Sequence, residues 1–456
     1  MSHRFHPSIL RDYDIRGPVG DRLGAADAFA IGRAFATRVQ RAGGTRVAVG
    51  RDGRLSSPML EAALVDGLAT SGVDVVRIGI GPSPMLYFAE ATLAVDGGIQ
   101  VTGSHNPRDQ NGFKMVLGGQ SFFGADVQDL ARIAAAGNWN TGAGTVADVD
   151  IADAYVTRLV AGYAGGTFRI GWDAGNGAAG PIVEKLVRHL PGEHHLLFTE
   201  VDGNFPNHHP DPTDEPNLAA LKDLVARERL DFGLAFDGDG DRIGAVDGDG
   251  RVLWGDQILA ILAGPLLASV PGATIVADVK SSDALFARIR DAGGRAVMWK
   301  SGHSNIKSRM REEGAALAGE LSGHIFFAEG YYGFDDALYA AIRLIHAVHV
   351  SGKTLAMLRD ELAPTFTSPE LRIPVAEDRR LAIVAEVAAR LAAEGAEVSA
   401  IDGVRVSTPD GWWLLRASNT QPAVTVRAEG RDEPSLARLL DTIALQLRES
   451  GVADWR

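Results

Sequence analysis

The sequence contains no cysteine. Disulfides, thiolate catalysis and cysteine-ligated zinc or iron–sulfur sites are therefore excluded. Long apolar segments are missing too, because the most apolar stretch, 258–270, is interrupted by Gly264 and Pro265 and is too short to span a bilayer. The opening residues, MSHRFHPSIL, lack the apolar region of a signal peptide. We therefore expect a soluble cytoplasmic protein.

Basic residues are fewer than acidic ones. Lys and Arg number 45 against 58 Asp and Glu, which gives a formal net charge of −13. This balance argues against a nucleic-acid partner and against binding to an anionic membrane surface. An anionic small molecule would be repelled at long range. A phosphate site in this chain must therefore be built from a local cluster of Arg and Lys.

The chain has 456 residues, which is too long for a single core and suggests three or four domains. Three segments each begin with a buried, strand-like run that ends in a polar or glycine-rich turn: 45–54, 168–180 and 273–282. Each segment later has a second such run that ends in a polar loop: 97–107, 232–242 and 315–324. The matching order predicts three related α/β units, each with a loop at the carboxyl end of a strand, where ligands bind.

The last ninety or so residues differ from these units. Helical patterns over 380–394 and 435–448 flank two predicted strands, 411–416 and 423–428. This order predicts a separate, smaller α+β domain. We expect domain boundaries that divide the chain into residues 1–150, 151–251, 252–365 and 366–456.

The loop Thr102–Pro107 (TGSHNP) presents a serine hydroxyl at the end of a strand. Gly103 frees the backbone before Ser104, and His105 could handle a proton or hold an oxyanion. These features suit an exposed nucleophile. The alternative is a polar turn in which Ser104 and Asn106 bond only to the backbone.

The segment Asp237–Arg242 (DGDGDR) places three alternating carboxylates at a strand exit. Such close anions repel each other unless a cation such as Mg²⁺ or Ca²⁺ lies among them. An EF-hand would need glycine and glutamate where the chain has Arg242 and Gly248, so that reading fails. A solvated acidic turn remains the alternative. The similar segment 247–250 is better explained as a hairpin turn.

Two further loops carry groups suited to a phosphosugar. In Gly319–His324 (GELSGH), Glu320 and Ser322 could bind vicinal hydroxyls, although a structural glutamate or helix cap explains the loop equally well. In Arg416–Pro422 (RASNTQP), a guanidinium, two hydroxyls and an amide could hold a phosphate, and a polar hairpin is the alternative. For the histidines of HHPD, 208–211, a structural role is favoured over a metal site.

Read together, these loops resemble the α-D-phosphohexomutase family, and within it the bacterial phosphomannomutase/phosphoglucomutases. The resemblance covers nearly the whole chain through an ordered set of motifs: YDIRG, GRDGR, TGSHNP, NGFK, FPNHHPDP, AFDGDGDR, GELSGH and RASNT. It implies three α/β domains of mixed sheet flanked by helices, with a smaller, mobile α+β domain, around a central cleft.

The resemblance also implies roles for individual residues. Ser104 would carry the phosphoryl group and would bind Mg²⁺ together with three carboxylates: Asp237, Asp239 and Asp241. The supporting catalytic residues would be Arg16, His105 and Lys114. The residues that it implies for substrate binding are Tyr13, Arg242, Lys280, His303, Glu320, Ser322, His324, Arg416, Ser418, Asn419 and Thr420.

The activity implied is the interconversion of hexose 1-phosphate and hexose 6-phosphate, with mannose or glucose as the sugar, through a 1,6-bisphosphate. Glucose 1,6-bisphosphate would act as activator, and the protein would be a monomer or a weak dimer. Three alternatives stay open: a phosphoglucosamine mutase, a serine-nucleophile phosphatase, and a phosphosugar-binding protein without turnover.

Overall fold

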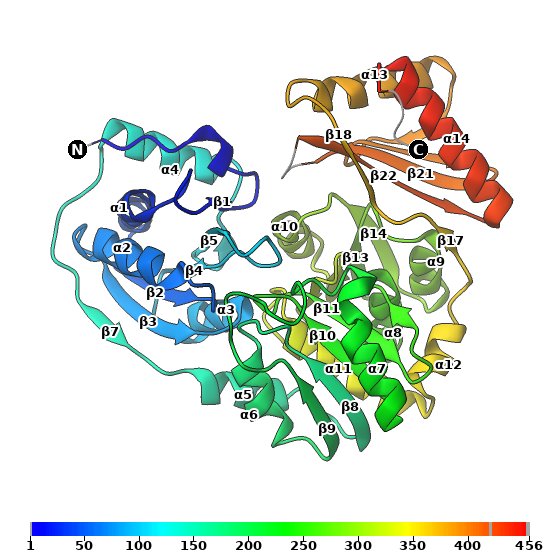
Figure 1. The fold of residues 1–456 in the computed structure, drawn as a ribbon, viewed down its shortest axis with the longest axis horizontal. Helices are drawn as coiled ribbons and strands as arrows, with labels where there is room; N and C mark the ends of the chain where they lie inside the picture. The colour runs from blue at the N-terminus through cyan, green and yellow to red at the C-terminus, as the bar shows by residue number, and fades with distance from the viewer. Residues whose placement is uncertain (1, 419–421, 453–456) are drawn as a thin grey trace.

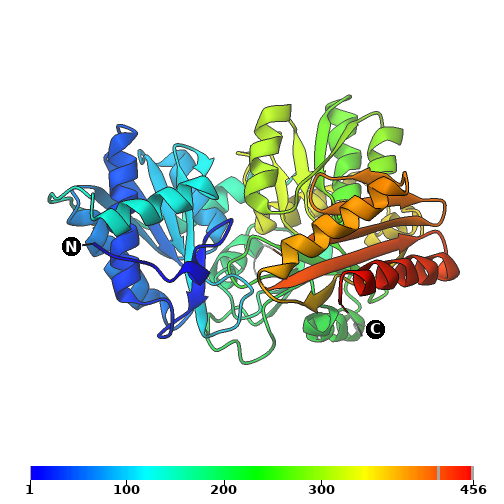
Figure 2. The ribbon, with the colours of Figure 1, turned by 90° about the horizontal axis from the view of Figure 1, so that it is seen from above.

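The structure is a computed structural model that describes residues 2–418 and 422–452. The chain forms four units, each built on its own sheet. In Figure 1 they follow one another in an arc, from the blue first unit through the green second and third units to the orange fourth unit. Figure 2 shows the first unit at one end of the molecule and the third and fourth units at the other.

The first unit contains a seven-stranded sheet in the order β1-β5-β4-β2-β3-β7, with β6 paired to β5. Its strands are β1 (Ile15–Pro18), β2 (Arg46–Arg51), β3 (Asp74–Ile80), β4 (Gly97–Val101), β5 (Gln110–Leu117), β6 (Gln120–Ser121) and β7 (Val146–Asp148). Its helices are η1 (Pro7–Ile9), α1 (Ala25–Arg41), α2 (Ser57–Ala69), α3 (Ser83–Thr92) and α4 (Ala125–Ala136).

The second unit has a five-stranded sheet in the order β12-β11-β10-β8-β9. Its strands are β8 (Phe168–Asp173), β9 (Gly192–Leu197), β10 (Phe232–Phe236), β11 (Ile243–Asp247) and β12 (Val252–Leu253). Its helices are α5 (Ala152–Val160), α6 (Gly180–Val187), η2 (Glu215–Leu218) and α7 (Ala219–Glu228).

The third unit has a four-stranded sheet in the order β14-β13-β15-β16. Its strands are β13 (Thr274–Asp278), β14 (Arg295–Trp299), β15 (Leu317–Gly319) and β16 (Ile325–Phe327). Its helices are α8 (Gly255–Ser269), α9 (Asp283–Asp291), α10 (His303–Glu313), α11 (Ala337–Ser351) and α12 (Leu355–Asp360).

These three sheets share one topology. Each has three neighbouring parallel strands followed by an antiparallel one: β3-β2-β4-β5, β9-β8-β10-β11 and β14-β13-β15-β16. The turn between the third and fourth strands carries TGSHNP in the first unit, DGDGDR in the second and ELSGH in the third. The prediction of three related units with equivalent loops is therefore confirmed.

The fourth unit is an antiparallel sheet in the order β17-β22-β21-β20-β19, with β18 also paired to β22. Its strands are β17 (Phe366–Thr367), β18 (Leu371–Pro374), β19 (Glu397–Ser399), β20 (Val404–Thr408), β21 (Gly411–Ala417) and β22 (Ala423–Gly430). Its helices are α13 (Arg379–Ala393) and α14 (Glu433–Glu449). The α+β prediction is confirmed, but the expectation of two strands was incomplete, because the other four strands are at most five residues long.

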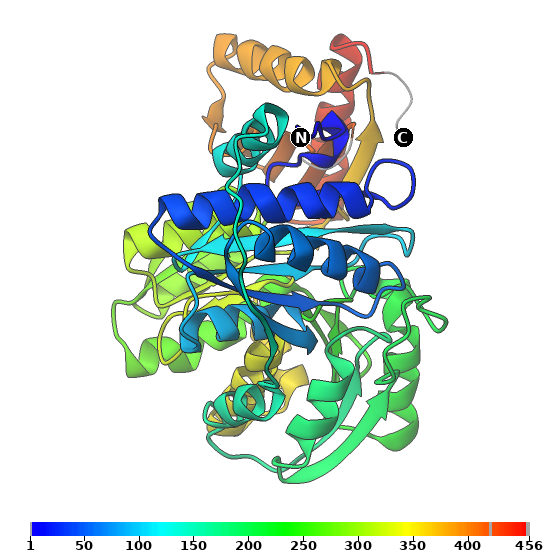
Figure 3. The same cartoon turned by 90° about the vertical axis from the view of Figure 1, so that its left-hand side faces the viewer.

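Close packing follows from the small and apolar residues of the helices. Helices α1 and α2 lie side by side in Figure 3. They approach so closely that a Cβ atom on Gly32 would lie 2.3 Å from the Leu64 carbonyl oxygen. The apolar stretch near residue 260 forms α8, most of which is buried in the core of the third unit. Within the described part of the chain, no helix has both the length and the apolar content needed to cross a membrane.

A buried carboxylate joins the second unit to the third. Asp336 caps the start of α11 by accepting a hydrogen bond from the Tyr339 backbone amide. Its side chain also accepts hydrogen bonds from the hydroxyls of Tyr155, at 2.9 Å, and Tyr331, at 2.7 Å. Burial raises the pKa of Asp336 to about 6, although these hydrogen bonds oppose the rise.

This pKa makes stability depend on pH in a defined direction. Because the folded pKa lies above the unfolded value, the contribution of Asp336 is complete below pH ~4 and is lost as the pH rises to about 6. We expect Asp336→Asn to remove this step, which is worth about 3 kcal/mol. The test compares unfolding free energies of both proteins between about pH 4 and 7. Parallel curves would contradict the assignment.

Candidate active site

The TGSHNP loop holds Ser104 in an unusual backbone conformation. Ser104 follows β4, is buried, and has φ = +49°, in the left-handed region that non-glycine residues rarely adopt. Its amide donates to Thr102 Oγ1 at 2.9 Å, and Thr102 in turn donates to Asp52 Oδ2 at 2.8 Å. Asp52 also accepts from the Gly103 amide at 3.0 Å. The GRDGR segment therefore fixes the backbone that presents the hydroxyl.

Arg54 binds the backbone of the same loop. Its guanidinium donates to four backbone carbonyls, those of Ser104, Asn106, Pro107 and Gln110, at 2.6–3.0 Å. A Cβ atom on Gly103 would lie 2.4 Å from Arg54 Nε, so the guanidinium packs against bare backbone. GRDGR is one of the motifs that carry the family resemblance, but no role was predicted for Arg54 within it. Arg54 Nε lies 3.3 Å from Asp52 Oδ2, but the other partners of this buried guanidinium are main-chain carbonyls, which leave no pairing signal in the sequence.

The three aspartates of DGDGDR lie together with Ser104. Asp237, Asp239 and Asp241 are fully buried, and one carboxylate oxygen from each lies within 4.8 Å of the others. Ser104 Oγ donates to Asp237 Oδ2 at 2.8 Å, which joins the loops of the first and second units. Burial, reinforced by the two neighbouring carboxylates, raises the pKa of Asp237 well above its usual range.

This cluster fits a divalent cation. The Oδ1 atoms of Asp239 and Asp241 are buried and lack hydrogen-bond partners among the described residues. Lys114 Nζ, on β5, donates to Asp239 at 2.7 Å and to Asp241. Ser83, at the start of α3, also bonds to Asp239. Hard carboxylate oxygens with open coordination suit Mg²⁺, and Asp237, Asp239 and Asp241 are the residues that would hold it.

Metal binding has a readout that is independent of catalysis. We expect Mg²⁺ to raise the melting temperature of chelator-treated protein by several degrees, since binding at about 100 times Kd adds about 2.7 kcal/mol. Asp239→Asn should weaken the shift, whereas Asp249→Asn, in the look-alike hairpin, should leave it intact. Thermal unfolding measured across a Mg²⁺ titration tests this. Equal shifts in the two variants would place the ion elsewhere.

Positive groups surround Ser104 on its other sides. Arg16, on β1, donates to Asn106 Oδ1 at 3.0 Å and also bonds to Asp14. The ring of His105 lies 3.2 Å from Ser104 Oγ through Nδ1. Burial, together with the charges of Arg242 and Arg16, lowers the pKa of His105 well below its usual value. His105 is therefore uncharged near pH 7, and its ring can exchange a hydrogen bond with Ser104 Oγ.

The pKa of Lys114 shifts in the opposite direction to that of His105. Burial disfavours the charge of the lysine, but Asp239 and Asp241 outweigh that effect and raise its pKa above the usual range. The lysine is therefore a fixed cation beside the carboxylates. The local cluster of Arg and Lys that the acidic composition demanded is thus present around the carboxylates.

The GELSGH loop reaches the same cluster from the third unit. His324 Nε2 lies 3.4 Å from Asp241 Oδ1, and its Nδ1 lies 3.2 Å from Glu320 and 3.1 Å from Ser322 Oγ. Burial opposes a charge on the ring, but Asp241 and Glu320 raise the pKa of His324 to about 9. His303 stacks on His324 at a ring-centroid distance of 5.5 Å. These four residues therefore extend the site away from Ser104.

Tyr13 and Lys280 lie at the borders between units. The Tyr13 hydroxyl donates to the Ser301 carbonyl at 2.9 Å, which links the first unit to the third. Lys280 Nζ lies 3.2 Å from Glu370 and 3.8 Å from Asp278. Glu370 precedes β18, so this ion pair ties the third unit to the fourth.

The described part of the RASNT motif begins at Arg416 and ends at Ser418. The Arg416 guanidinium pairs with Asp402 at 3.1 Å, and Ser418 bonds through its amide to the Ala423 carbonyl. Two predicted residues, Asn419 and Thr420, lie outside the described residues. The partners Glu370 and Asp402 were missed, because nothing in the sequence links single acidic residues to cations so far along the chain.

Two lookalike motifs each make a structural contact. Asp247 ends β11 and accepts hydrogen bonds from the Asp249 and Arg251 amides, as a hairpin turn requires. His208 Nε2 lies 3.0 Å from Asp173 Oδ2, and His208 is part of no metal-ligand cluster within residues 2–418 and 422–452. Both motifs therefore support the fold.

Four family models match the chain in order. Three describe the α/β/α domains I, II and III of phosphoglucomutase/phosphomannomutase, over residues 8–140, 153–250 and 254–366. The fourth describes the C-terminal domain of the same family, over residues 370–446. Each of the four loops described above lies within one of these matches.

Curated relatives and a solved structure agree with the models. The chain is 43% identical over 443 residues to a phosphomannomutase/phosphoglucomutase of Pseudomonas aeruginosa, covering 97% of this chain and 96% of the relative. It is also 43% identical to a phosphoglucomutase of Neisseria gonorrhoeae, covering 94% and 95%. A phosphoglucomutase/phosphomannomutase family protein of Burkholderia thailandensis superposes with a TM-score of 0.92 at 42% identity, covering 98% and 99% of the two chains. The chain belongs to the phosphoglucomutase/phosphomannomutase family.

Proposed function

We propose that this protein interconverts hexose 1-phosphate and hexose 6-phosphate, with mannose or glucose as the sugar, through a phosphorylated Ser104. The carrying observation is the 2.8 Å contact between Ser104 Oγ and Asp237, inside a buried cluster in which two carboxylate oxygens accept no hydrogen bond from the described residues. A nucleophile among metal-binding carboxylates is a combination that phosphoryl transfer needs and that simple binding does not.

In the first half-reaction the bond between phosphorus and Ser104 Oγ breaks, and a bond forms to O6 or O1 of the sugar phosphate. The sugar hydroxyl gives up its proton, and we propose His105 as the acceptor, because its Nδ1 lies 3.2 Å from Ser104 Oγ. The product is a hexose 1,6-bisphosphate. In the second half-reaction the bisphosphate has turned over. The bond between its other phosphorus and the sugar oxygen breaks, a bond from that phosphorus to Ser104 Oγ forms, and the released sugar oxygen takes up the proton removed in the first step. Mg²⁺, when bound, would neutralise charge on the transferring group.

Turning the intermediate over requires a site with two separate halves. Arg416 and Ser418, together with Asn419 and Thr420, are proposed to bind the phosphate that is not transferred in either orientation. Glu320 and Ser322 are proposed to bind sugar hydroxyls, with Lys280 and His303 beside them. Arg242 Nε lies 3.4 Å from His324 Nε2, between the metal cluster and the sugar loop.

The deciding assay follows two products in parallel. The protein is incubated with Mg²⁺, a trace of glucose 1,6-bisphosphate, and either mannose 1-phosphate or glucose 1-phosphate. Formation of 6-phosphates from both sugars supports a dual-specificity mutase. Free phosphate without 6-phosphate would indicate a phosphatase, and turnover of glucosamine 1-phosphate alone would indicate a phosphoglucosamine mutase.

Several finer points belong to the same proposal. These are activation by glucose 1,6-bisphosphate, a monomeric or weakly dimeric state, a cytoplasmic location, and the absence of nucleic-acid and membrane partners. The first is tested by omitting the bisphosphate from the assay, and the second by light scattering of the purified protein.

A further inference from the structure

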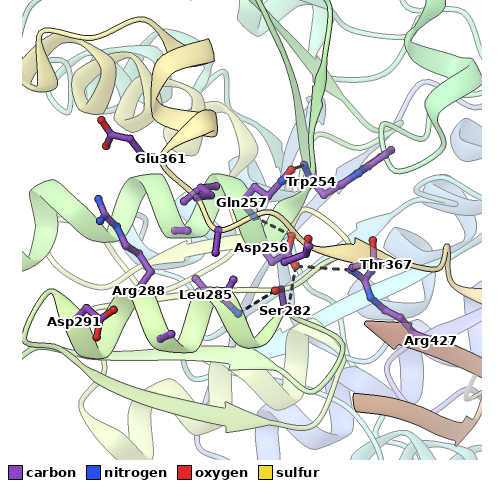
Figure 4. A pocket seen from close by; sticks show the side chains of 16 residues that line it. Trp254, Asp256, Gln257, Ser282, Leu285, Arg288, Asp291, Glu361, Thr367 and Arg427 are labelled. Atoms are coloured by element: carbon purple, nitrogen blue, oxygen red, sulfur yellow. Dashed lines mark hydrogen bonds and ion pairs between the residues drawn. The ribbon is translucent and has the colours of Figure 1, made fainter. Parts of the chain in front are cut away.

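A cavity of about 200 Å³ lies between the third unit and the fourth. The start of α8 and the length of α9 form its floor, the connection between α12 and β17 covers it, and Arg427 of β22 enters from the fourth unit (Figure 4). Among the described residues, none of those predicted for catalysis, metal binding or substrate binding lines this cavity.

Arg427 is a buried cation without a close partner. The residue is only 7% exposed, and its guanidinium points towards Asp256 across the cavity in Figure 4. The distance to Asp256 Oδ2 is 3.9 Å, which is too long for a hydrogen bond. Arg427 Nε is buried without a hydrogen-bond partner in residues 2–418 and 422–452. A buried guanidinium in this condition calls for an acceptor.

The carboxylates of the cavity do not meet this need. Asp256 Oδ1 accepts from the Gln257 amide at 2.9 Å, and Oδ2 accepts from the Ser282 amide at 3.0 Å. Both oxygens are therefore already hydrogen-bonded to backbone amides near the starts of α8 and α9. Glu361 is exposed and pairs with Lys353. Asp291 is exposed at the rim. The group that the cavity lacks is therefore a hydrogen-bond acceptor with negative charge.

We propose that this cavity binds a small organic monocarboxylate, whose two oxygens accept hydrogen bonds from Arg427. The planar guanidinium matches a carboxylate in a bidentate arrangement. A single charge is required, because the lining has three carboxylates against two arginines, Arg288 and Arg427, and the excess negative charge repels a polyanion. Trp254 and Leu285 supply apolar walls, and the hydroxyl of Thr367 lies beside the guanidinium to bond a hydroxyl of the ligand.

The occupant would bridge two units that both serve the active site. It would contact α8 on one side, and the start of α8 is packed so tightly that a Cβ atom on Gly255 would lie 2.2 Å from the Glu320 carbonyl oxygen. It would contact β22 on the other side, the strand that pairs with β21 and its Arg416. The ligand is therefore placed where it fastens the fourth unit to the third.

Ligand-observed NMR titrations of the full chain test this proposal with lactate and gluconate as probes and citrate as the polyanion. We expect at least one monocarboxylate to show saturable binding, with citrate at least tenfold weaker. Arg427→Met should weaken monocarboxylate binding tenfold or more. Ala284→Leu, which fills the cavity from α9 and leaves the arginine in place, should do the same and serves if the first variant fails to fold.

The matched control is Arg290→Ala, which removes an exposed arginine of α9 that does not line the cavity, and it should leave binding unchanged. Three outcomes would overturn the proposal. They are no saturable binding of either monocarboxylate, binding that survives both cavity variants, and citrate binding as tight as that of lactate.

Discussion

Replacing Ser104 by alanine is expected to abolish mutase turnover, with kcat falling by about 10⁴-fold or more, the scale seen when a nucleophile is removed. The loss should be this large because Ser104 Oγ is the hydroxyl that lies both against the Asp triad, at 2.8 Å, and against the neutral ring of His105, at 3.2 Å. Steady-state assays with glucose 1-phosphate and mannose 1-phosphate measure the effect.

Measuring phosphorylation of the protein distinguishes loss of the nucleophile from general damage to the active site. After incubation with glucose 1,6-bisphosphate, mass spectrometry of peptides should find one phosphoryl group on Ser104 in the parent protein and none in the alanine variant. Ser83→Ala is the control, because it removes a hydroxyl that bonds to Asp239 but leaves the nucleophile. That variant should still be phosphorylated on Ser104. Full turnover by Ser104→Ala would contradict the mechanism.

The parts of the site that the sequence predicted are contiguous along the chain. Ser104 and His105 share one turn, and the three aspartates share another. The alternation of Asp and Gly in DGDGDR is visible without any knowledge of long-range contacts. The topology then brings these turns together, because each follows the third strand of an equivalent sheet. A repeated strand order could be predicted because every unit repeats the same apolar runs.

The parts that were missed depend on partners far apart in sequence. Arg54 bonds to carbonyls some fifty residues away, and a carbonyl has no residue identity that a pattern could reveal. Asp402 and Glu370 are single acidic residues in polar connections, like many solvent-exposed ones. The short strands β17 to β19 bury few side chains, so their apolar periodicity is too weak to predict them.

Arg54→Lys is expected to lower kcat by about 100-fold while leaving the protein folded, because a 1 Å misplacement of a reacting group costs about that much. Lysine keeps the charge but has a single nitrogen, which cannot reach the four carbonyls that the guanidinium holds. The left-handed Ser104 backbone then relaxes, and the hydroxyl moves away from Asp237. Each lost charge-assisted hydrogen bond also lowers stability by about 1.5–3 kcal/mol.

Among the described residues, Arg54 makes no hydrogen bond or ion pair with the proposed substrate-binding loops of the third and fourth units, so KM should change far less than kcat. The matched control is Arg51→Lys at the end of β2, where the arginine pairs with buried Glu61 at 2.9 Å and makes no bond to the Ser104 loop. This control should lose stability without the fall in kcat. Steady-state kinetics below both melting temperatures separate the two effects. An unchanged kcat in folded Arg54→Lys would mean that the loop keeps its shape without the guanidinium, and that Asp52 and Thr102 suffice to hold Ser104.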